Sequence, residues 1–274
     1  MRLGLIGYGN IAGTLLRLIA ETPEIRLEAL TVLGLPGKTD ELGKDLEASH
    51  GGLGCSFAAV SSAEELLAAK PDFVVECAGH QAVVSHVPTI LKAGVDVVLV
   101  SIGAFAHREL EAELRAAAEE GGARIVLPAG AVGGIDLLAA LRPAGLTSVT
   151  YQGCKPPAAW AGTPAETAVD LDGLKEATVF FTGTARDAAA QYPKNANVAA
   201  TIALAGLGFD DTKVELIADP AASGNTHEFT AVSGVARTSI RIENLPSPGN
   251  IKTSVTTVYS VLRELRNRVA PVAI

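Results

Sequence analysis

Cysteine, aromatic residues and positive charge are all scarce in this sequence. The three cysteines, Cys55, Cys77 and Cys154, form no CxxC pair, so we expect no disulfide framework and a reducing cytoplasm. Lys and Arg number 22 against 30 Asp and Glu, and no basic run occurs, which argues against nucleic acid as a partner. No apolar run reaches the roughly 18 residues that a membrane-spanning helix needs, so we expect no membrane association.

Histidine is also sparse, and its spacing does not suggest a metal site. The five histidines are His50, His80, His86, His107 and His227. His80 and His86 are six residues apart, a spacing that does not place two zinc ligands on one helix face. We therefore predict that no metal is bound.

The sequence is rich instead in small and aliphatic residues. The chain has 274 residues, of which 48% are hydrophobic and only 4% aromatic. That length is sufficient for two packed domains, and the Ala, Val, Leu and Gly content suits α/β layers. The opening MRLGLIGYGN has neither a long apolar core nor a cleavage site, so we expect no signal peptide.

The N-terminal segment RLGLIGYGNIAG has the pattern of a dinucleotide-binding turn between a strand and a helix. Gly7 permits the tight turn, Gly9 leaves room for a pyrophosphate, and the small Ala12 lets the helix lie close to the strand. The helix start, with Asn10 and Ile11, offers free N–H groups and a positive dipole end to phosphates. We predict a dinucleotide contact here; the alternative is an ordinary Gly-rich loop.

Strands and helices then alternate through the first half of the chain. Strands are predicted at 26–33, 71–79, 95–101 and 123–131, and helices at 61–69, 81–94 and 107–122. Continuous apolar strands between helices indicate a doubly wound parallel sheet, the α/β Rossmann class. Ligands of such sheets bind at the carboxyl ends of the strands, so Cys77, Ala78 and Ala131 are predicted beside the cofactor. Their small size is equally typical of strand-to-helix turns.

The segment after the second strand bears on cofactor choice. An NAD enzyme of this class commonly has an acidic residue at the end of that strand, where it binds the ribose. Here the sequence is LTVLGLPGKTD, with Lys38 in place of an early acid, and 34–55 is predicted to be a long Gly-rich loop. The sequence therefore leaves NAD and NADP both open.

The second half has a different pattern, with runs of strands and separate helices. Strands are predicted at 146–155, 175–185, 212–220, 226–233 and 236–244, and helices at 133–145, 195–208 and 252–269. This order indicates an α+β domain on a mixed sheet. We predict a Rossmann domain at 1–131 and a substrate and dimerisation domain at 132–250, with the helix 251–269 packing back on the first.

His227 lies in one of these strands. Alternation places Asn225, His227, Phe229 and Ala231 on one face, which is partly apolar. Taken alone, the pattern favours a buried histidine with a satisfied hydrogen bond over a functional one. The nearby Asn225 on the same face is also what a polar site over an apolar floor requires, so both interpretations stay open.

Several segments together resemble the L-aspartate dehydrogenase family over nearly the whole chain. The resemblance is carried by the glycine turn and by VVECAGHQAV, VSIGAF, LPAGAVGGID, YPKNANVAATIALAG and GNTHEF. It implies oxidation of L-aspartate with NAD or NADP to iminoaspartate, which hydrolyses or enters pyridine nucleotide biosynthesis, and a homodimer. It also implies that Ala131 and Asn197 contact the dinucleotide and that His227 is catalytic.

The chemistry that the resemblance implies gives these residues possible roles. A neutral imidazole can accept the proton of the amine, activate the water that hydrolyses the imine, or only anchor the substrate. The amide of Asn197 suits the nicotinamide carboxamide. Two substrate carboxylates require cations or N–H donors, for which Lys194 and, more weakly, Asn195 and Asn225 are candidates; a solvated lysine and a helix-capping asparagine are the alternatives.

Three other interpretations are open. The chain could be a related oxidoreductase, resembling homoserine dehydrogenase or dihydrodipicolinate reductase, which would share the glycine turn but not the later motifs. It could be a dinucleotide-sensing protein without chemistry, although no basic DNA-binding helix is present. A thiol enzyme using Cys77 and His80 is conceivable, but a small cysteine at a strand end is usually a packing residue.

Overall fold

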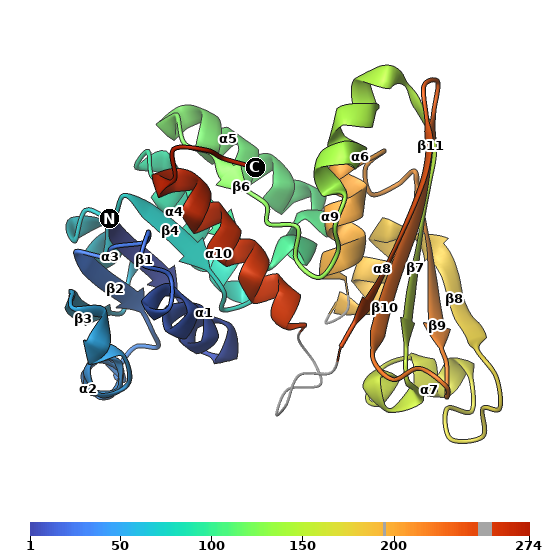
Figure 1. Ribbon diagram of the computed structural model, residues 1–274, viewed down its shortest axis with the longest axis horizontal. Coiled ribbons are helices and arrows are strands. Elements are labelled where there is room, and N and C mark those ends of the chain that lie inside the picture. Colours follow the sequence, from blue (N-terminus) through green and yellow to red (C-terminus); the bar gives the residue numbers. More distant parts are fainter. Residues whose placement is uncertain (194–195, 246–253) are drawn as a thin grey trace. The chain divides into compact units, whose positions relative to one another are not determined.

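The chain forms two compact units in the computed structural model, which describes residues 1–193, 196–245 and 254–274 (Figure 1). Unit 1 comprises Met1–Pro128 together with Val258–Ile274, and unit 2 comprises Ala129–Thr257. The chain thus leaves unit 1 once and returns to it with its last helix.

Unit 1 contains a six-stranded sheet in which every paired strand is parallel. The strands follow the order β3-β2-β1-β4-β5-β6. Their bounds are β1 Arg2–Ile6, β2 Ala29–Leu33, β3 Ser56–Val60, β4 Phe73–Glu76, β5 Val97–Leu99 and β6 Ile125–Val126. This is the doubly wound order of dinucleotide-binding domains, and it confirms the predicted Rossmann class.

Helices connect these strands. Their bounds are α1 Asn10–Ala20, α2 Thr39–His50, α3 Ala63–Ala68, α4 His80–Lys92 and α5 Arg108–Gly121, with short 3-10 turns at Gly51–Leu53 and Ile102–Ala106. At α3 the Ser62 side chain caps the helix, because it accepts the N–H of Glu65 at 3.2 Å. At α1 the buried residues Leu15, Leu16 and Ile19 lie on the face toward the sheet.

The predicted loop at 34–55 is wrong, because most of it is helix α2. The helix escaped prediction since Gly43 lies at its centre and few apolar residues mark its period. Leu46 is completely buried and Leu42, one turn earlier, packs on the same core, so tertiary contact holds the helix. Asp40 and Glu41 in its first turn match the positive end of the helix dipole.

The last helix, α10 (Val255–Val269), contributes one face to the core of unit 1. Val258, Val261, Leu262 and Leu265 are buried in the same cluster as residues of β1, β2 and α1. Near its end Arg268 lies over the ring of Phe73, 4.2 Å from the centroid, and pairs with Asp96. The C-terminal segment is therefore a structural part of the dinucleotide-binding unit.

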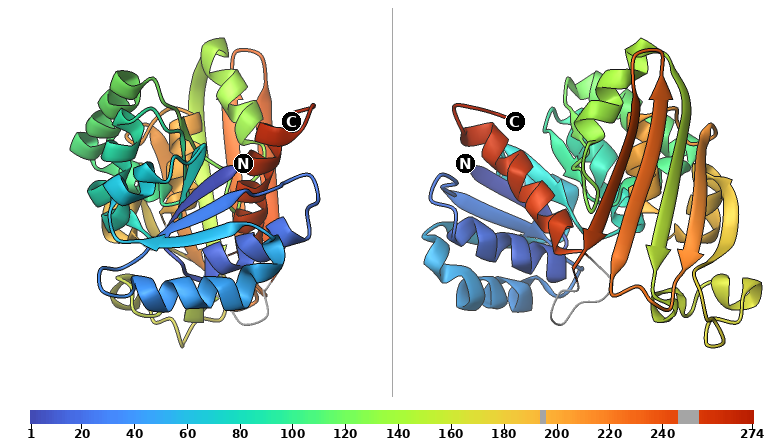
Figure 2. Two further views of the ribbon diagram at one scale, coloured as in Figure 1. Left: turned by 90° about the vertical axis from the view of Figure 1, so that its left-hand side faces the viewer. Right: turned by 45° about the vertical axis from the view of Figure 1, so that its right-hand side comes forward.

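Unit 2 is built on a mixed five-stranded sheet in the order β11-β10-β7-β9-β8 (Figure 2). The bounds are β7 Leu146–Lys155, β8 Thr178–Thr184, β9 Thr212–Ala218, β10 Asn225–Ser233 and β11 Arg237–Asn244. β7 and β9 are parallel and the other pairs antiparallel. The mixed sheet confirms the predicted α+β class of the second half.

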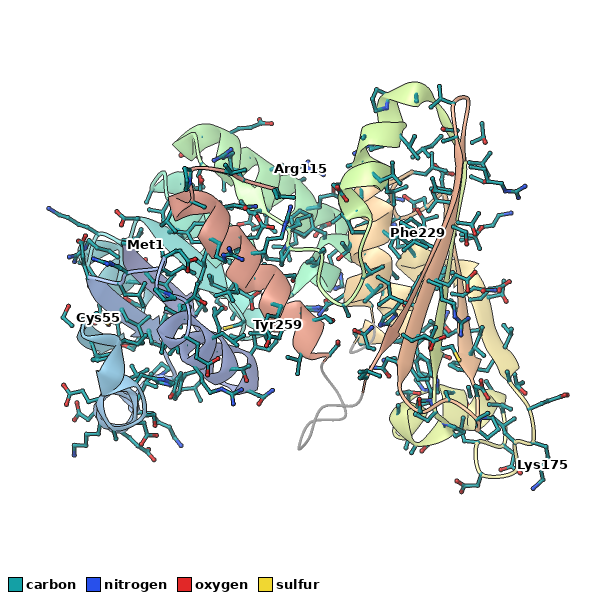
Figure 3. The ribbon with its side chains drawn as sticks, in the orientation of Figure 1. Met1, Cys55, Arg115, Lys175, Phe229 and Tyr259 are labelled. Carbon is teal, nitrogen blue, oxygen red and sulfur yellow. The ribbon has the colours of Figure 1, made fainter. Side chains whose placement is uncertain are left out.

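Helices of unit 2 cover one face of this sheet. Their bounds are α6 Ile135–Leu141, α7 Ala165–Ala168, α8 Ala185–Gln191 and α9 Asn197–Ala205, with 3-10 turns at Arg142–Ala144 and Pro157–Trp160. Phe229, on β10 (Figure 3), packs beneath the start of α6 near Gly134. His227, Phe229 and Ala231 alternate as buried residues along β10, as predicted, so His227 belongs to the helix-covered face.

Among the residues that the structure describes, no helix combines the length and the apolar character that crossing a bilayer requires.

The turn after β1 generates a first prediction. Gly7 has φ +88°, and a Cβ added there would lie 2.6 Å from the Cβ of Ala78. Gly7→Ala should lower the free energy of unfolding by at least about 1–2 kcal/mol, the cost of a left-handed non-glycine residue, plus the clash. Gly13→Ala is the matched control, since a Cβ there meets nothing within 4 Å and alanine favours a helix. Equal urea midpoints for the two variants would contradict this reasoning.

Candidate functional site

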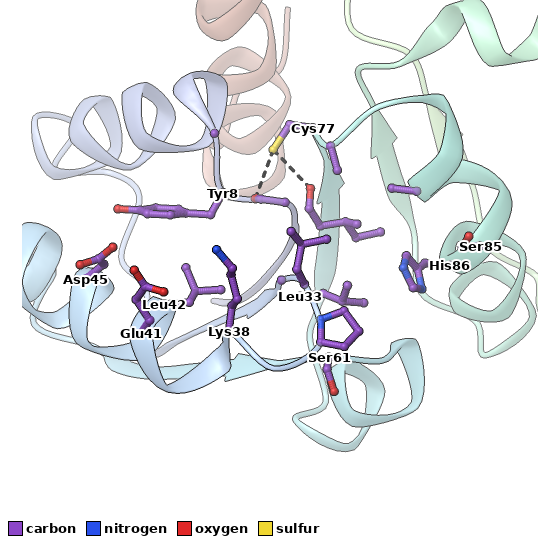
Figure 4. A pocket seen from close by; sticks show the side chains of 18 residues that line it. Tyr8, Leu33, Lys38, Glu41, Leu42, Asp45, Ser61, Cys77, Ser85 and His86 are labelled. Atoms are coloured by element: carbon purple, nitrogen blue, oxygen red, sulfur yellow. Dashed lines mark hydrogen bonds between the residues drawn. The ribbon is translucent and has the colours of Figure 1, made fainter.

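A cleft of about 600 Å³ lies at the carboxyl ends of the strands in unit 1 (Figure 4). Its lining comes from the turn after β1, the segment after β2, helix α2, and the segments that follow β3 and β4. The lining residues are Ile6, Gly7, Tyr8, Gly9, Leu33, Gly34, Leu35, Pro36, Lys38, Glu41, Leu42, Asp45, Ser61, Cys77, Ala78, Ala82, Ser85 and His86. This edge of a doubly wound sheet is where such folds bind their ligands.

The glycine turn fits a dinucleotide pyrophosphate. Gly9 caps α1 in an extended conformation, with no side chain bonded to the helix N-terminus in the described structure and no acidic residue in the first turn. A Cβ at Gly9 would meet nothing within 4 Å, so its position faces open space. The first N–H groups of α1 can therefore receive a phosphate, which the helix dipole favours.

The α2 end of the cleft carries both signs of charge. Lys38, Glu41 and Asp45 line it, and Figure 4 places their side chains on the same side of the cleft as the ring of Tyr8. The Tyr8 hydroxyl lies 3.0 Å from Nε2 of His50 at the end of α2. This mixed lining does not by its charge exclude either a 2′-hydroxyl or a 2′-phosphate.

A buried carboxylate supports the wall of the cleft. Glu76, at the end of β4, is fully buried and accepts the backbone N–H groups of Ala78 and Gly79, both at 2.8 Å. It also accepts the N–H and the hydroxyl of Ser101, after β5, at 3.0 and 2.9 Å. One side chain therefore fixes two neighbouring strand ends, and with them the loop that carries Ala78.

Cys77 is a packing residue of this wall. Its thiol contacts the carbonyl oxygens of Ile6 and Gly7 at 3.5 and 3.7 Å. Burial, reinforced by the charge of Glu76, raises the pKa of the Cys77 thiol far above its usual range. A thiol that keeps its proton is a poor nucleophile, so the structure gives the thiol-enzyme alternative no support.

The other predicted cofactor residues have the following positions. Asn10 and Ile11 begin α1, and Ala12 is fully buried against the sheet, where its small size permits close packing. In unit 2, Ala131 is buried and its carbonyl accepts the Asn244 side-chain amide at 3.1 Å. Asn197 is the first residue of α9, and its carbonyl accepts the hydroxyl of Thr201.

His227 lies in unit 2 and is buried, with a relative solvent exposure of 4%. Its Nδ1 is 2.8 Å from the hydroxyl of Tyr151, a fully enclosed residue of β7. The register pairs His227 with Gly153 and Phe229 with Tyr151, so the tyrosine reaches the histidine diagonally across two strands. The two rings are nearly parallel, at an interplanar angle of 24°.

Lys155 follows on the same face of β7, two residues beyond Gly153. Its Nζ lies 5.0 Å from the centroid of the Trp160 ring, a cation–π contact. Burial lowers the pKa of Lys155 to about 8. Burial and, secondarily, the charge of Lys155 lower the pKa of His227 to about 3, so the imidazole is neutral at physiological pH.

The predicted substrate residues divide into two groups. Asn225 begins β10 on the face of His227 and pairs with Asn244 of β11. Lys194 and Asn195 lie outside the described residues; the residue that caps α9 is Ala196, and its side chain makes no capping hydrogen bond.

Sequence reasoning missed Tyr151, Lys155 and Glu76. The alternation that groups Asn225 with His227, applied to the predicted strand 146–155, would have grouped Tyr151 with Lys155. What the pattern does not contain is the register, which brings the face of β7 beside the face of β10. A glutamate at the end of an otherwise apolar strand, as in FVVE, was the available signal for Glu76.

Two family models cover most of the chain. Residues 7–128 match the homoserine dehydrogenase NAD-binding domain, and residues 136–268 match the C-terminal domain of aspartate dehydrogenase. The first match confirms the prediction of NAD or NADP as the cofactor. The protein is thus a dehydrogenase with a Rossmann domain for NAD or NADP.

Similarity to curated proteins identifies the family of the whole chain. The chain is 42% identical to the L-aspartate dehydrogenase of Cupriavidus necator over 100% of both chains, and 44% identical to that of Ruegeria pomeroyi over 99% of this chain and 94% of the relative. It belongs to the L-aspartate dehydrogenase family, as the sequence motifs indicated.

Solved structures agree with this assignment. The crystal structure of aspartate dehydrogenase from Thermotoga maritima superposes with a TM-score of 0.75 at 28% identity, covering 100% of this chain and 99% of that one. A hyperthermophilic archaeal homoserine dehydrogenase in complex with NADPH gives a TM-score of 0.57 at 14% identity over 97% and 98% of the chains, which indicates a shared fold.

The Glu76 network generates a second prediction. Glu76→Ala removes the acceptor of three backbone N–H groups and should lower the free energy of unfolding by about 2–4 kcal/mol and weaken NADH binding. Glu65→Ala is the control, because Glu65 also accepts a backbone N–H, that of Ser61, but at the surface; we expect a loss below about 1 kcal/mol. Urea unfolding and fluorescence titration with NADH measure both effects, and an equal loss in the two variants would refute the assignment.

The buried imidazole generates a third prediction. Unfolded histidine has a pKa near 6.5 and folded His227 one of about 3, so the unfolded state binds the extra proton between these values. The stabilisation by neutral His227 is complete above pH 6.5 and is lost as the pH falls toward 3, at up to about 1.4 kcal/mol per pH unit. Urea unfolding of wild type and His227→Gln from pH 7 to 4 should show a shallower loss in the variant. Parallel curves would contradict the low pKa.

Proposed function

We propose that this protein oxidises L-aspartate to iminoaspartate with NAD or NADP, and that His227 is its catalytic residue. The observation that carries the proposal is a neutral, buried imidazole beside a lysine on the covered face of the second unit, in a chain whose first unit binds a dinucleotide. Iminoaspartate then hydrolyses to oxaloacetate and ammonia, or serves pyridine nucleotide biosynthesis. Membership of the L-aspartate dehydrogenase family supports the same activity.

The residues of unit 1 hold the cofactor in this proposal. Gly7, Gly9 and the N–H groups of Asn10 and Ile11 would hold the pyrophosphate, with Ala12 keeping the helix close. Cys77 and Ala78 form the adjacent wall. When bound, the cofactor would supply the acceptor for the hydride of the substrate α-carbon.

Unit 2 contributes the substrate residues and two further contacts. Ala131 and Asn197 would contact the dinucleotide, as the family resemblance implies. His227 contacts the substrate, and Asn225, on the same strand face, donates or accepts a hydrogen bond through its amide. Lys194 and Asn195, from the same motif as Asn197, remain proposed substrate contacts.

Lys155 is the additional cation that the structure supplies for a dicarboxylate substrate. It shares the covered face of unit 2 with His227, and the low polarity around it strengthens its attraction for an anion. A carboxylate bound there offsets the positive charge that lowers the pKa of His227. Substrate binding and the state of the imidazole are therefore coupled electrostatically.

The proposal also includes the cellular compartment and the oligomeric state. The enzyme acts in the cytoplasm, which three free cysteines support, because such thiols persist in a reducing compartment. It acts as a homodimer on a small-molecule substrate, in line with the family resemblance.

An assay tests the activity directly. Purified protein should form NADH or NADPH from L-aspartate, measured at 340 nm from neutral to alkaline pH with each cofactor. His227→Ala should lower kcat/KM by at least about 100-fold, the effect of losing one proton-transfer or hydrogen-bonding group. Homoserine is the control substrate for the related oxidoreductases. No reduced cofactor under any condition, or full turnover by His227→Ala, would refute the proposal.

A further inference from the structure

The hydrogen bond between Tyr151 and His227 bears on which ring nitrogen of the imidazole carries the proton. The tyrosine hydroxyl and Nδ1 are 2.8 Å apart, and both residues are buried. Gly153 keeps this geometry open, because a Cβ at that position would lie 2.7 Å from the tyrosine oxygen. The contact is therefore built into the pairing of β7 with β10.

The direction of this bond follows from the state of the phenol. Burial raises the pKa of Tyr151 far above its usual range, so the hydroxyl keeps its hydrogen. In the part of the chain that the structure describes, Nδ1 of His227 is the acceptor that this hydrogen reaches. If Nδ1 carried its own hydrogen, the enclosed phenolic O–H would lose its acceptor, which is costly in a buried site. Tyr151 therefore donates, and Nδ1 accepts.

The remaining nitrogen then holds the single proton of a neutral imidazole. Burial and the charge of Lys155 lower the pKa of His227 to about 3, so no second proton is bound near neutral pH. The residues paired with His227 on the neighbouring strands are Gly153 and Ile242, which do not titrate. Nε2 is consequently an N–H donor.

We propose that Tyr151 is a positioning residue that keeps the proton of His227 on Nε2, so that His227 acts on the substrate as a hydrogen-bond donor and not as a proton acceptor. The inference rests on the proposed function and specifies its chemistry. The group that Nε2–H recognises is a carboxylate oxygen of the substrate, with Lys155 as the positive partner on the same face. The substrate ammonium loses its proton to solvent before the hydride leaves.

The tautomer can be measured without turnover. A long-range proton–nitrogen spectrum of protein labelled with 15N-histidine, recorded at pH 7 without ligands, distinguishes protonated from unprotonated ring nitrogens, and His227→Gln assigns the signals. We expect His227 with Nε2 protonated and Nδ1 unprotonated. A proton on Nδ1, or a doubly protonated ring, would overturn the proposal whether or not the protein oxidises L-aspartate.

A Tyr151→Phe variant tests the role of the hydroxyl. Without the donor, the His227 nitrogen signals should shift toward a mixture of tautomers, and kcat/KM should fall about tenfold, the loss of one hydrogen bond. Tyr259→Phe removes an exposed hydroxyl and is the control, with unchanged signals and kinetics. Unchanged His227 signals in a folded Tyr151→Phe variant would refute the positioning role.

Substitutions of His227 distinguish a hydrogen-bond donor from a proton acceptor. A glutamine amide can accept from Tyr151 and still donate an N–H, but it cannot take up a proton. His227→Gln should therefore retain at least about tenfold more kcat/KM than His227→Ala, with the pH profile of wild type. Equal inactivity of the two variants, or loss of a wild-type titration limb in His227→Gln, would identify a base and overturn the proposal. Absence of aspartate turnover in wild type would instead refute the proposed function, and the spectrum would still decide the tautomer.

Discussion

The structure of unit 1 depends on the close approach of two backbone segments at the ends of β1 and β4. Gly7 and Ala78 lie closer than any larger residue at position 7 permits, and the buried carboxylate of Glu76 holds the second segment in place. A left-handed glycine and a buried charge are both unfavourable alone. Together they leave an uncapped helix N-terminus facing an open cleft, which is the property that a phosphate site needs.

In unit 2 the central feature is a polar side chain, the imidazole of His227, that is buried away from water. Tyr151 supplies a partner that suits a buried neutral imidazole, a neutral hydroxyl placed at Nδ1 by the strand register. Lys155 adds a charge that acts in the same sense, by making a protonated imidazole still less favourable. The same local arrangement thus holds in one state a group that would titrate in water.

Much of the fold could be predicted from the sequence because its signals are local. Apolar runs separated by amphipathic segments indicated the parallel sheet, and alternation placed His227 on a buried face. Helix α2 was missed because its stability comes from Leu46 in the core and not from its own composition. Tyr151 and Lys155 were missed for a related reason: strand register depends on contacts between distant segments, and a pattern within one strand cannot contain it.

The course of the chain through its two units has a consequence for synthesis. Most of unit 2 is made before the helix that closes the core of unit 1, because Val258, Val261, Leu262 and Leu265 follow the strands of unit 2 in the sequence. The dinucleotide-binding unit, although its strands precede those of unit 2, therefore exposes part of its apolar interior until α10 has been synthesised. Unit 2 is contiguous and can gather its residues earlier, so the order of encoding and the order of completion are reversed.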